Sequence, residues 1–186
     1  ENVSQNNNIN TSKEGTNKIR HEDGGPAFCS QERIGKNEKP FKMWKFRSMV
    51  VNADQMIDQL EDQNEIEGAM FKIKDDPRIT KIGHTIRKYS LDELPQLWNV
   101  LIGDMSLVGP RPPLPSEVEE YTDYDKQRLL VMPGCTGLWQ VTKRNEADFD
   151  EMVWLDIVYI NHSGILEDLK LIIKTIGVVI HPNGAY

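Results

Sequence analysis

The chain has 186 residues, 38% of them hydrophobic, and a formal net charge of −7. This length favours one domain with a real core. The negative charge argues against a nucleic-acid-binding protein, because phosphate neutralisation needs a basic face. The two cysteines, Cys29 and Cys135, show neither metal spacing nor a disulfide framework, which favours a reduced compartment. No apolar run reaches the roughly 18 residues that would predict a membrane-spanning helix.

The first 23 residues are polar and rich in Asn, Ser, Thr, Lys and Glu. Such a segment buries too little apolar surface to offset its ordering entropy, so we predict a disordered tail or the remnant of a tag or linker. The chain begins with Glu1 rather than Met, which indicates a fragment or a processed form. We therefore expect the folded domain to cover residues 24–186.

A small sheet is predicted directly after this tail. Ala27–Ser30 is a candidate strand, Gly35–Pro40 a hairpin loop and Phe41–Met49 a longer strand. Alternation along the longer strand puts Lys45 and Arg47 on one face. From the pattern alone, these cations are either solvated charges on an edge strand or part of a functional site.

Most of the remaining chain is predicted to be helical, with one further strand candidate over Thr136–Val141. The predicted helices cover Asn52 to about Glu67, Thr80–Tyr89, Ser116–Met132, Asp148–Tyr159 and Ser163–Ile180. Since strands and helices do not alternate regularly, we expect an α+β fold: a helix-dominated single domain with a small, mostly antiparallel sheet.

The stretch Ser90–Gly103 has the strongest pattern. Apolar residues recur at helical spacing and mark one face of an amphipathic helix that ends at Gly103; they are Leu94, Leu97, Trp98, Leu101 and Ile102. The helix start has two readings: Ser90 and Glu93 form a capping box, or Pro95 occupies the first helical position.

In both readings, Asp92 and Glu93 lie at or beside the helix N-terminus, where free N–H groups suit phosphate. The acidic pair is either a helix cap or, with Arg87 before it and Arg111 after it, part of a site for an anion and a metal. Arg111 lies in the proline-rich stretch Gly109–Pro115, which is stiff and would fix the guanidinium at low entropic cost.

Two later features stay open on pattern alone. Asp156 lies on the apolar face of its helix and needs a partner, for which Arg144 is the natural candidate; a structural ion pair and a ligand-binding role are both consistent with this.

The last helix has one apolar face, which either packs against the domain or dips into a membrane interface; this face consists of Leu166, Leu169, Ile173, Ile176 and Ile180.

A long central block resembles the bacterial sugar transferases, the monotopic phosphoglycosyl transferases that start capsule, O-antigen and exopolysaccharide synthesis. This block comprises Asp75–Thr80 through Arg87, Ser90–Leu97 and Gly103–Pro112. The segments Lys45–Met49 and Pro133–Val141 are similar to shorter blocks of the family, and the similarity runs from about Gly25 to Tyr186.

The resemblance implies transfer of a sugar-1-phosphate from a UDP-sugar to polyprenyl (undecaprenyl) phosphate, with release of UMP. It implies that Asp92 is the nucleophile, which would form a covalent aspartyl-phosphosugar intermediate, and that Glu93 helps to bind Mg²⁺. The phosphate-binding cations would be Lys45, Arg47, Arg87 and Arg111, and the nucleotide-binding residues Arg144 and Asp156. The full-length protein would act at the cytoplasmic face of the bacterial membrane, whereas the present fragment is expected to be soluble.

This sequence departs from the family pattern at two places. Members usually carry a basic and then apolar segment before the block at Gly25–Phe28, where this chain has the polar residues Glu1–Glu22. Lys143 replaces the glycine that usually precedes Arg144.

Two other functions remain as alternatives to the transferase. One is a non-catalytic sugar-nucleotide-binding or interaction module, and the other is a phosphatase-like hydrolase with the same aspartyl chemistry.

Overall fold

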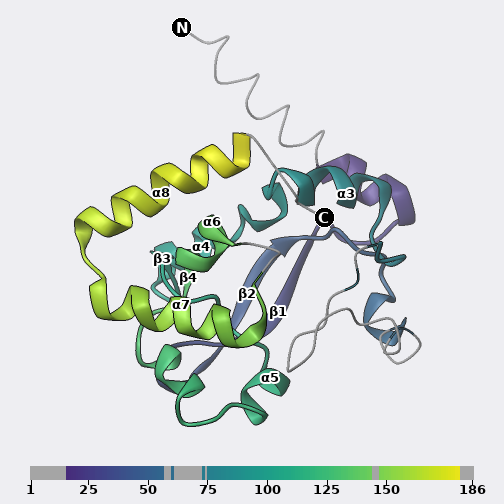
Figure 1. The fold of residues 1–186 in the computed structure, drawn as a ribbon. Helices are drawn as coiled ribbons and strands as arrows, with labels where there is room; N and C mark the ends of the chain where they lie inside the picture. The colour runs from purple at the N-terminus through teal and green to yellow at the C-terminus, as the bar shows by residue number, and fades with distance from the viewer. Residues whose placement is uncertain (1–15, 57–59, 61–72, 74, 144–146, 181–186) are drawn as a thin grey trace, which may run out of the picture.

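An antiparallel hairpin runs through the middle of the fold (Figure 1). The computed structural model describes residues 16–56, 60, 73, 75–143 and 147–180. In it, β1 (Phe28–Ile34) pairs with β2 (Pro40–Phe46) across a turn that contains the short 3-10 helix η1 (Lys36–Glu38). The sheet predicted for this region is therefore present, although both strands differ from the predicted lengths.

A second, parallel pair of strands joins distant parts of the chain. β3 (Ser106–Val108) pairs with β4 (Gly134–Thr136). The backbones approach so closely that a Cβ atom on Gly134 would lie 2.1 Å from the backbone nitrogen of Gly109, so only glycine fits there. The strand predicted over Thr136–Val141 is wrong, because a helix begins at Leu138.

Helices surround these two sheets. The α-helices are α3 (Lys81–Lys88), α4 (Gln96–Ile102), α5 (Pro115–Glu119), α6 (Leu138–Thr142), α7 (Phe149–His162) and α8 (Ile165–Ile180). The other 3-10 helices are η2 (Ala53–Met56), η4 (Leu91–Glu93) and η5 (Asp125–Leu130). This arrangement confirms the predicted helix-dominated α+β fold. No helix in the described ranges combines the length and apolar character needed to cross a membrane.

The core lies where α6, α7 and α8 meet the parallel strands. One cluster of buried residues joins Trp139 to Met152, Val153 and Leu155, and a second joins Val108 to Tyr159 and Leu171. The start of α7 matches the predicted one, because Asp148 accepts a hydrogen bond from the Glu151 N–H at 2.8 Å.

The helix predicted over Ser116–Met132 is wrong, because the chain breaks into α5 and η5. Asp125 accepts hydrogen bonds from both the backbone N–H and the hydroxyl of Thr122, at 2.8 Å each, and this local pairing competes with a continuous helix. Of the helix predicted from Asn52, the structure shows η2 and a helical, buried Leu60; most of the rest of that prediction lies outside the described residues.

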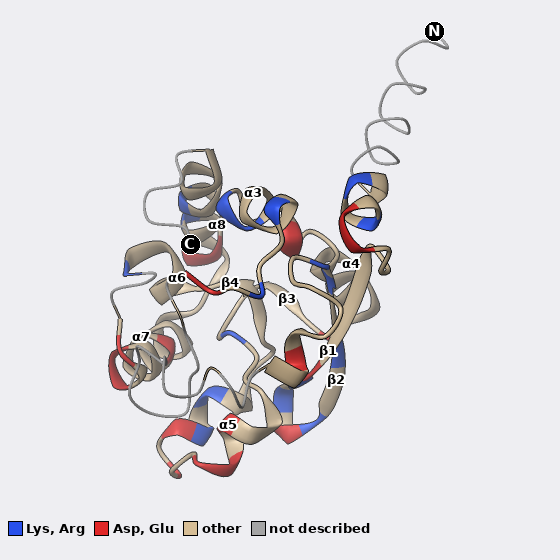
Figure 2. Cartoon of the chain, turned by 90° about the vertical axis from the view of Figure 1, so that its right-hand side faces the viewer, with Lys and Arg blue, Asp and Glu red and all other residues tan. Residues whose placement is uncertain are grey.

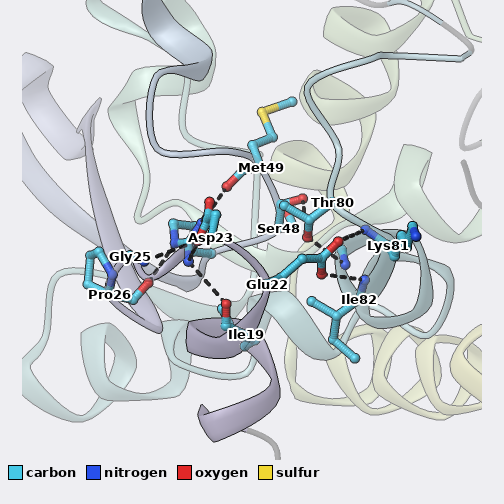
Figure 3. A network of polar contacts seen from close by, with 12 residues as sticks. Ile19, Glu22, Asp23, Gly25, Pro26, Ser48, Met49, Thr80, Lys81 and Ile82 are labelled. Carbon is cyan, nitrogen blue, oxygen red and sulfur yellow. Dashed lines mark hydrogen bonds and ion pairs between the residues drawn. The ribbon is translucent and has the colours of Figure 1, made fainter.

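A helix over residues 16–23 packs onto the domain, where the sequence predicted a disordered tail (Figure 3). Ile19 is buried. Glu22 accepts hydrogen bonds from the N–H groups of Lys81 and Ile82 at the start of α3, and Asp23 forms an ion pair with Arg47 at 2.6 Å. The prediction of disorder is wrong for residues 16–23, because hydrogen bonds and an ion pair stabilise a segment that buries little apolar surface. Residues 1–15 lie outside the described ranges.

The helix α4 turns its apolar face outward and its polar face inward. Leu101 is 79% exposed, whereas Asn99 is fully buried. The Asn99 side chain accepts a hydrogen bond from the Trp44 N–H and donates one to the Lys42 carbonyl, so it fastens α4 to β2. Figure 2 shows α4 without a charged residue. An apolar helix face exposed to solvent indicates an interaction surface.

The start of α4 lies one residue after the one predicted with Pro95 as the first helical residue, since Gln96 takes that position. Pro95 is its N-cap, and Ser90 has the left-handed φ of 52° with no side-chain capping bond, so the capping box is not formed. At the other end, Gly103 stops the helix with φ 86°.

The last helix also leaves its apolar face exposed. Of α8, only Leu171 is buried in the described residues. The face predicted to pack against the domain is at least half exposed at every position, and it consists of Leu166, Leu169, Ile173, Ile176 and Ile180. Burial of this face is therefore wrong, and the alternative, contact with another apolar phase, stays a prediction.

Candidate active site

A polar cavity of about 280 Å³ lies beside η4. Five of the eight residues predicted for the site line it: Lys45, Arg87, Asp92, Glu93 and Arg111. They come from β2, α3, η4 and the loop after β3, so the fold brings together groups that are distant in the sequence. Two carboxylates and three cations facing one space are suited to a phosphate-containing ligand.

The acidic pair is positioned by a tight turn between α3 and η4. Ser90 adopts the left-handed conformation in this turn, and Asp92 follows with only 8% of its surface exposed. Burial raises the pKa of Asp92 to about 6, with the negative charge of Glu93 adding to the effect and the charges of Lys45 and Arg87 opposing it. Asp92 is thus mostly ionised at neutral pH and poorly solvated, as suits a nucleophile.

The cations are held in different ways. The Lys45 ammonium lies 3.8 Å from the Glu93 carboxylate, and burial lowers the pKa of Lys45 to about 8. The Arg87 Nε atom donates to the Ser48 hydroxyl at 2.9 Å, and burial lowers the pKa of Arg87. Arg111 is held between two prolines in the loop after β3.

Other lining residues were not singled out from the sequence. From the turn before η4, from β4 and from α6 they are Ser90, Cys135, Thr136, Trp139, Gln140 and Val141, and from α8 they are Thr175, Val178 and Val179. The block Pro133–Val141, already noted for its similarity to a family block, was the signal for several of them. The end of α8 carried no such signal, because its residues are apolar or neutral.

Two of these residues have buried polar atoms without a hydrogen-bond partner. Within the described residues, the Gln140 Oε1 and Trp139 Nε1 atoms have no hydrogen-bond partner, although buried polar groups are normally paired. In contrast, burial raises the pKa of the Cys135 thiol to about 11. Cys135 therefore stays protonated at neutral pH, which argues against a cysteine nucleophile.

Arg47, predicted to bind phosphate, lies outside this cavity. Its guanidinium donates to the Asp23 carboxylate and to the carbonyls of Pro26, Met49 and Ile19. The strand β2 ends at Phe46, so the alternation that grouped Arg47 with Lys45 does not extend to it. Arg47 fastens the helix over residues 16–23 to the domain.

Asp156, predicted to bind the nucleotide, does not line the cavity either. It is fully buried and pairs with Arg128 at 2.5 Å. Burial raises the pKa of Asp156 to about 6, against the opposing charge of Arg128. The partner expected from the sequence, Arg144, lies outside the described residues.

The oxygen donors at the cavity suit a magnesium ion that is shared with a phosphate substrate. No three His, Cys, Asp or Glu side chains gather into a metal cluster in the part of the chain that the structure describes. Magnesium, however, is usually held by one or two carboxylates together with substrate phosphates. Glu93, half-buried at the cavity beside Asp92, supplies such an oxygen donor.

The chain is similar to sugar transferases from several bacteria. A family model described as "Bacterial sugar transferase" matches residues 16–182. Galactosyl transferase CpsE of Streptococcus agalactiae is 55% identical over 164 residues, which are 88% of this chain and 36% of that protein. Undecaprenyl-phosphate galactose phosphotransferase of Salmonella typhimurium is 48% identical over 168 residues, which are 88% of this chain and 35% of that protein.

A shorter relative is covered more fully. Exopolysaccharide production protein ExoY of Sinorhizobium fredii is 40% identical over 172 residues, which are 90% of this chain and 76% of that protein. In contrast, the chain spans about a third of the length of the two relatives above.

Proposed function

Since the chain belongs to the bacterial sugar transferase family, we propose that it transfers a sugar-1-phosphate from a UDP-sugar to polyprenyl (undecaprenyl) phosphate. One observation carries this proposal: the cavity joins Asp92 and Glu93 to the cations Lys45, Arg87 and Arg111. The reaction brings first a diphosphate and then a lipid phosphate to an anionic carboxylate site, so it needs cations where the charge develops. The names of the relatives from Salmonella and Streptococcus support galactose as a first sugar to test.

Asp92 would act as a nucleophile in a two-step transfer. In the first step, a carboxylate oxygen of Asp92 forms a bond to the phosphorus that carries the sugar. The bond from this phosphorus to the bridging oxygen breaks, and UMP leaves with the electron pair. In the second step, a phosphate oxygen of the lipid acceptor attacks the same phosphorus and releases the Asp92 carboxylate.

The cations and Glu93 have separate parts in this proposal. Lys45, Arg87 and Arg111 would hold the oxygens of the transferred phosphate and stabilise their charge in the transition state. Glu93 would hold Mg²⁺, which when bound neutralises charge on the diphosphate and the leaving UMP. Arg144 stays a predicted nucleotide-binding residue, whereas Asp156 is too deeply buried to touch the nucleotide from its present position.

The exposed apolar surface supports a membrane setting for the acceptor. Leu94, directly after Glu93, extends the exposed apolar face of α4 toward the cavity, and half of the Leu94 side chain is exposed. Beside it lies an apolar groove of about 520 Å³, lined by Phe28, Trp44, Phe46, Leu94, Pro95 and Trp98. We propose that this surface rests on the inner face of the cytoplasmic membrane, where it would meet the lipid-linked acceptor.

The intact mass of the protein tests the first step. The protein is incubated with Mg²⁺ and a panel of UDP-sugars, without lipid. A mass gain of one sugar-phosphate is expected for the wild type and for Asp150→Asn, which changes an exposed aspartate on α7. No gain is expected for Asp92→Asn. A gain in Asp92→Asn would refute the assignment of the nucleophile, and release of free sugar-1-phosphate into water would favour the hydrolase instead.

A further inference from the structure

The loop that carries Arg111 is held by four consecutive carbonyl groups. Each of these carbonyls, from Pro110 to Pro113, accepts one hydrogen bond from another part of the chain. In order, the donors are the Gly134 N–H at 2.8 Å, Arg128 Nη2 at 3.3 Å, Arg33 Nη1 at 3.1 Å and the Ile34 N–H at 2.9 Å. The loop is therefore fixed from β4, η5 and β1 at once.

Proline explains why the loop is held through its acceptors. Pro110, Pro112 and Pro113 have no N–H group, and their rings restrict φ. Apart from Arg111, these residues can form backbone hydrogen bonds only as acceptors, from donors elsewhere in the chain. Two of the four donors are side chains, Arg33 and Arg128, so the position of Arg111 depends on residues that do not line the cavity.

Arg128 links the loop to the middle of α7. It is 2% exposed, and its guanidinium also donates to the Asp156 carboxylate and to the Tyr121 hydroxyl at 2.9 Å. The Asp156 carboxylate thus fixes the orientation of a planar donor group whose Nη2 atom reaches the Arg111 carbonyl.

Arg33 holds the next carbonyl without a carboxylate partner of its own. It is 5% exposed and takes part in none of the ion pairs between described residues. Its hydrogen bonds go to the Pro112 carbonyl and the Gln31 side chain. Burial and the charge of Arg111 lower the pKa of Arg33 to about 10. A buried, unpaired cation is an expensive structural contact, which points to a role beyond stability.

We infer that Arg33 and the Arg128–Asp156 ion pair are positioning residues, which hold the loop so that the Arg111 guanidinium meets the transferred phosphate. This inference rests on the proposed function of the cavity. It predicts that Arg33 and Arg128 act on the reaction only through Arg111.

A double-mutant cycle tests this dependence. The rate of adduct formation at Asp92 is measured for Arg33→Met, Arg128→Met, Arg111→Ala and the two double variants that include Arg111→Ala. We expect Arg33→Met and Arg128→Met each to slow the wild type about tenfold, and to change the rate of Arg111→Ala less than about twofold, because residues in one network are not additive. Arg33→Lys, which keeps a donor, should restore part of the rate.

Arg47→Met is the matched control, because Arg47 is a buried arginine whose hydrogen bonds go elsewhere. Its effect should be the same with and without Arg111→Ala. Thermal unfolding reports whether each variant is folded, and Asp156→Asn replaces Arg128→Met if the latter is not. Equal effects of Arg33→Met in both backgrounds, or no effect at all, would overturn the inference.

The affinity for UDP separates this inference from the proposed function. If the wild type forms no adduct, the proposed covalent step is wrong. The same double-mutant cycle is then repeated with the dissociation constant for UDP, measured by calorimetry, in place of the rate. Loss of affinity in Arg33→Met that disappears in the Arg111→Ala background supports positioning. If Arg111→Ala changes neither the rate nor the UDP affinity, Arg111 has no phosphate to meet and the inference is wrong.

Discussion

The carboxylate of Asp92 lies in surroundings that favour its neutral form. Its pKa is raised to about 6 from an ordinary 3.8, chiefly by burial, which corresponds to about 2–3 kcal/mol at a site this deeply buried. Between these two pH values the native state binds the proton more tightly than the unfolded chain does. The ionised Asp92 carboxylate therefore destabilises the folded state fully above about pH 6, and this destabilisation is absent below about pH 3.8.

We accordingly predict that Asp92→Asn stabilises the protein at pH 8 by about 2 kcal/mol, while it abolishes adduct formation. Calorimetric unfolding at pH 8 and near pH 4 measures the effect. The gain should shrink strongly at the lower pH, where the wild-type carboxyl is protonated. An equal gain at both pH values would show that the ionised charge is not its source.

The pH dependence of the reaction should reflect two of the cavity residues. Asp92 must be ionised to attack, and Lys45, whose pKa is lowered to about 8, must be protonated to stabilise phosphate. We predict a bell-shaped profile of kcat/KM with limbs near pH 6 and pH 8, measured by UMP release. In Lys45→Met, the basic limb should vanish and the acidic limb should move to higher pH, because the Lys45 charge lowers the pKa of Asp92. An acidic limb that stays in place would contradict this coupling.

At the same scale, the sequence predicted the residue types of the site better than their partners. Lys45, Asp92 and Arg111 do line one cavity, since the motifs around them are local. Asp156 was expected to pair with Arg144, the nearer cation in the sequence, but it pairs with Arg128, which is 28 residues away. The partner of a buried charged side chain depends on tertiary packing, which the spacing of residues in the sequence does not report.

At the scale of elements, α4 shows what a periodic pattern leaves undecided. The spacing of its apolar residues predicted a helix that ends at Gly103, and this is confirmed. It did not predict which face is buried, because periodicity reports only that two faces differ. The buried face is the polar one, since Asn99 satisfies backbone groups of β2.

This inverted arrangement predicts unequal effects for two substitutions on α4. Asn99→Ala should destabilise the domain by about 2–4 kcal/mol, because it leaves buried backbone groups unpaired. Leu101→Gln, on the exposed face, should change the free energy of unfolding by less than about 0.5 kcal/mol but weaken binding to vesicles of anionic phospholipid. Urea unfolding and vesicle sedimentation measure the two effects. Unchanged sedimentation in Leu101→Gln would speak against α4 as a membrane contact.

At the scale of the whole molecule, the cavity is closed by segments from distant parts of the chain. The acidic pair lies in η4, whereas Thr175, Val178 and Val179 come from α8, near the other end of the described residues. Figure 1 shows α8 at the edge of the fold, next to α6 and the parallel strands. Its contacts with the domain include the buried side chain of Leu171 and a hydrogen bond between the hydroxyls of Thr175 and Thr136 at 2.8 Å.

Because Leu171 is the only buried side chain in the described part of α8, loosening this helix there should affect the cavity before the rest of the fold. Leu171 is fully buried against Val108 and Tyr159, so Leu171→Ala should cost about 2–5 kcal/mol of local packing. We predict a loss of amide exchange protection in α8 and a KM for the UDP-sugar raised several-fold, with β1 and β2 still protected. Leu169→Ala makes the same change at a side chain that is 51% exposed, and should alter neither quantity. If Leu171→Ala lowers exchange protection in α8 but leaves KM unchanged, α8 borders the cavity without contributing to substrate binding. If exchange protection falls equally in β1 and β2, α8 unfolds only together with the whole domain and cannot open by itself.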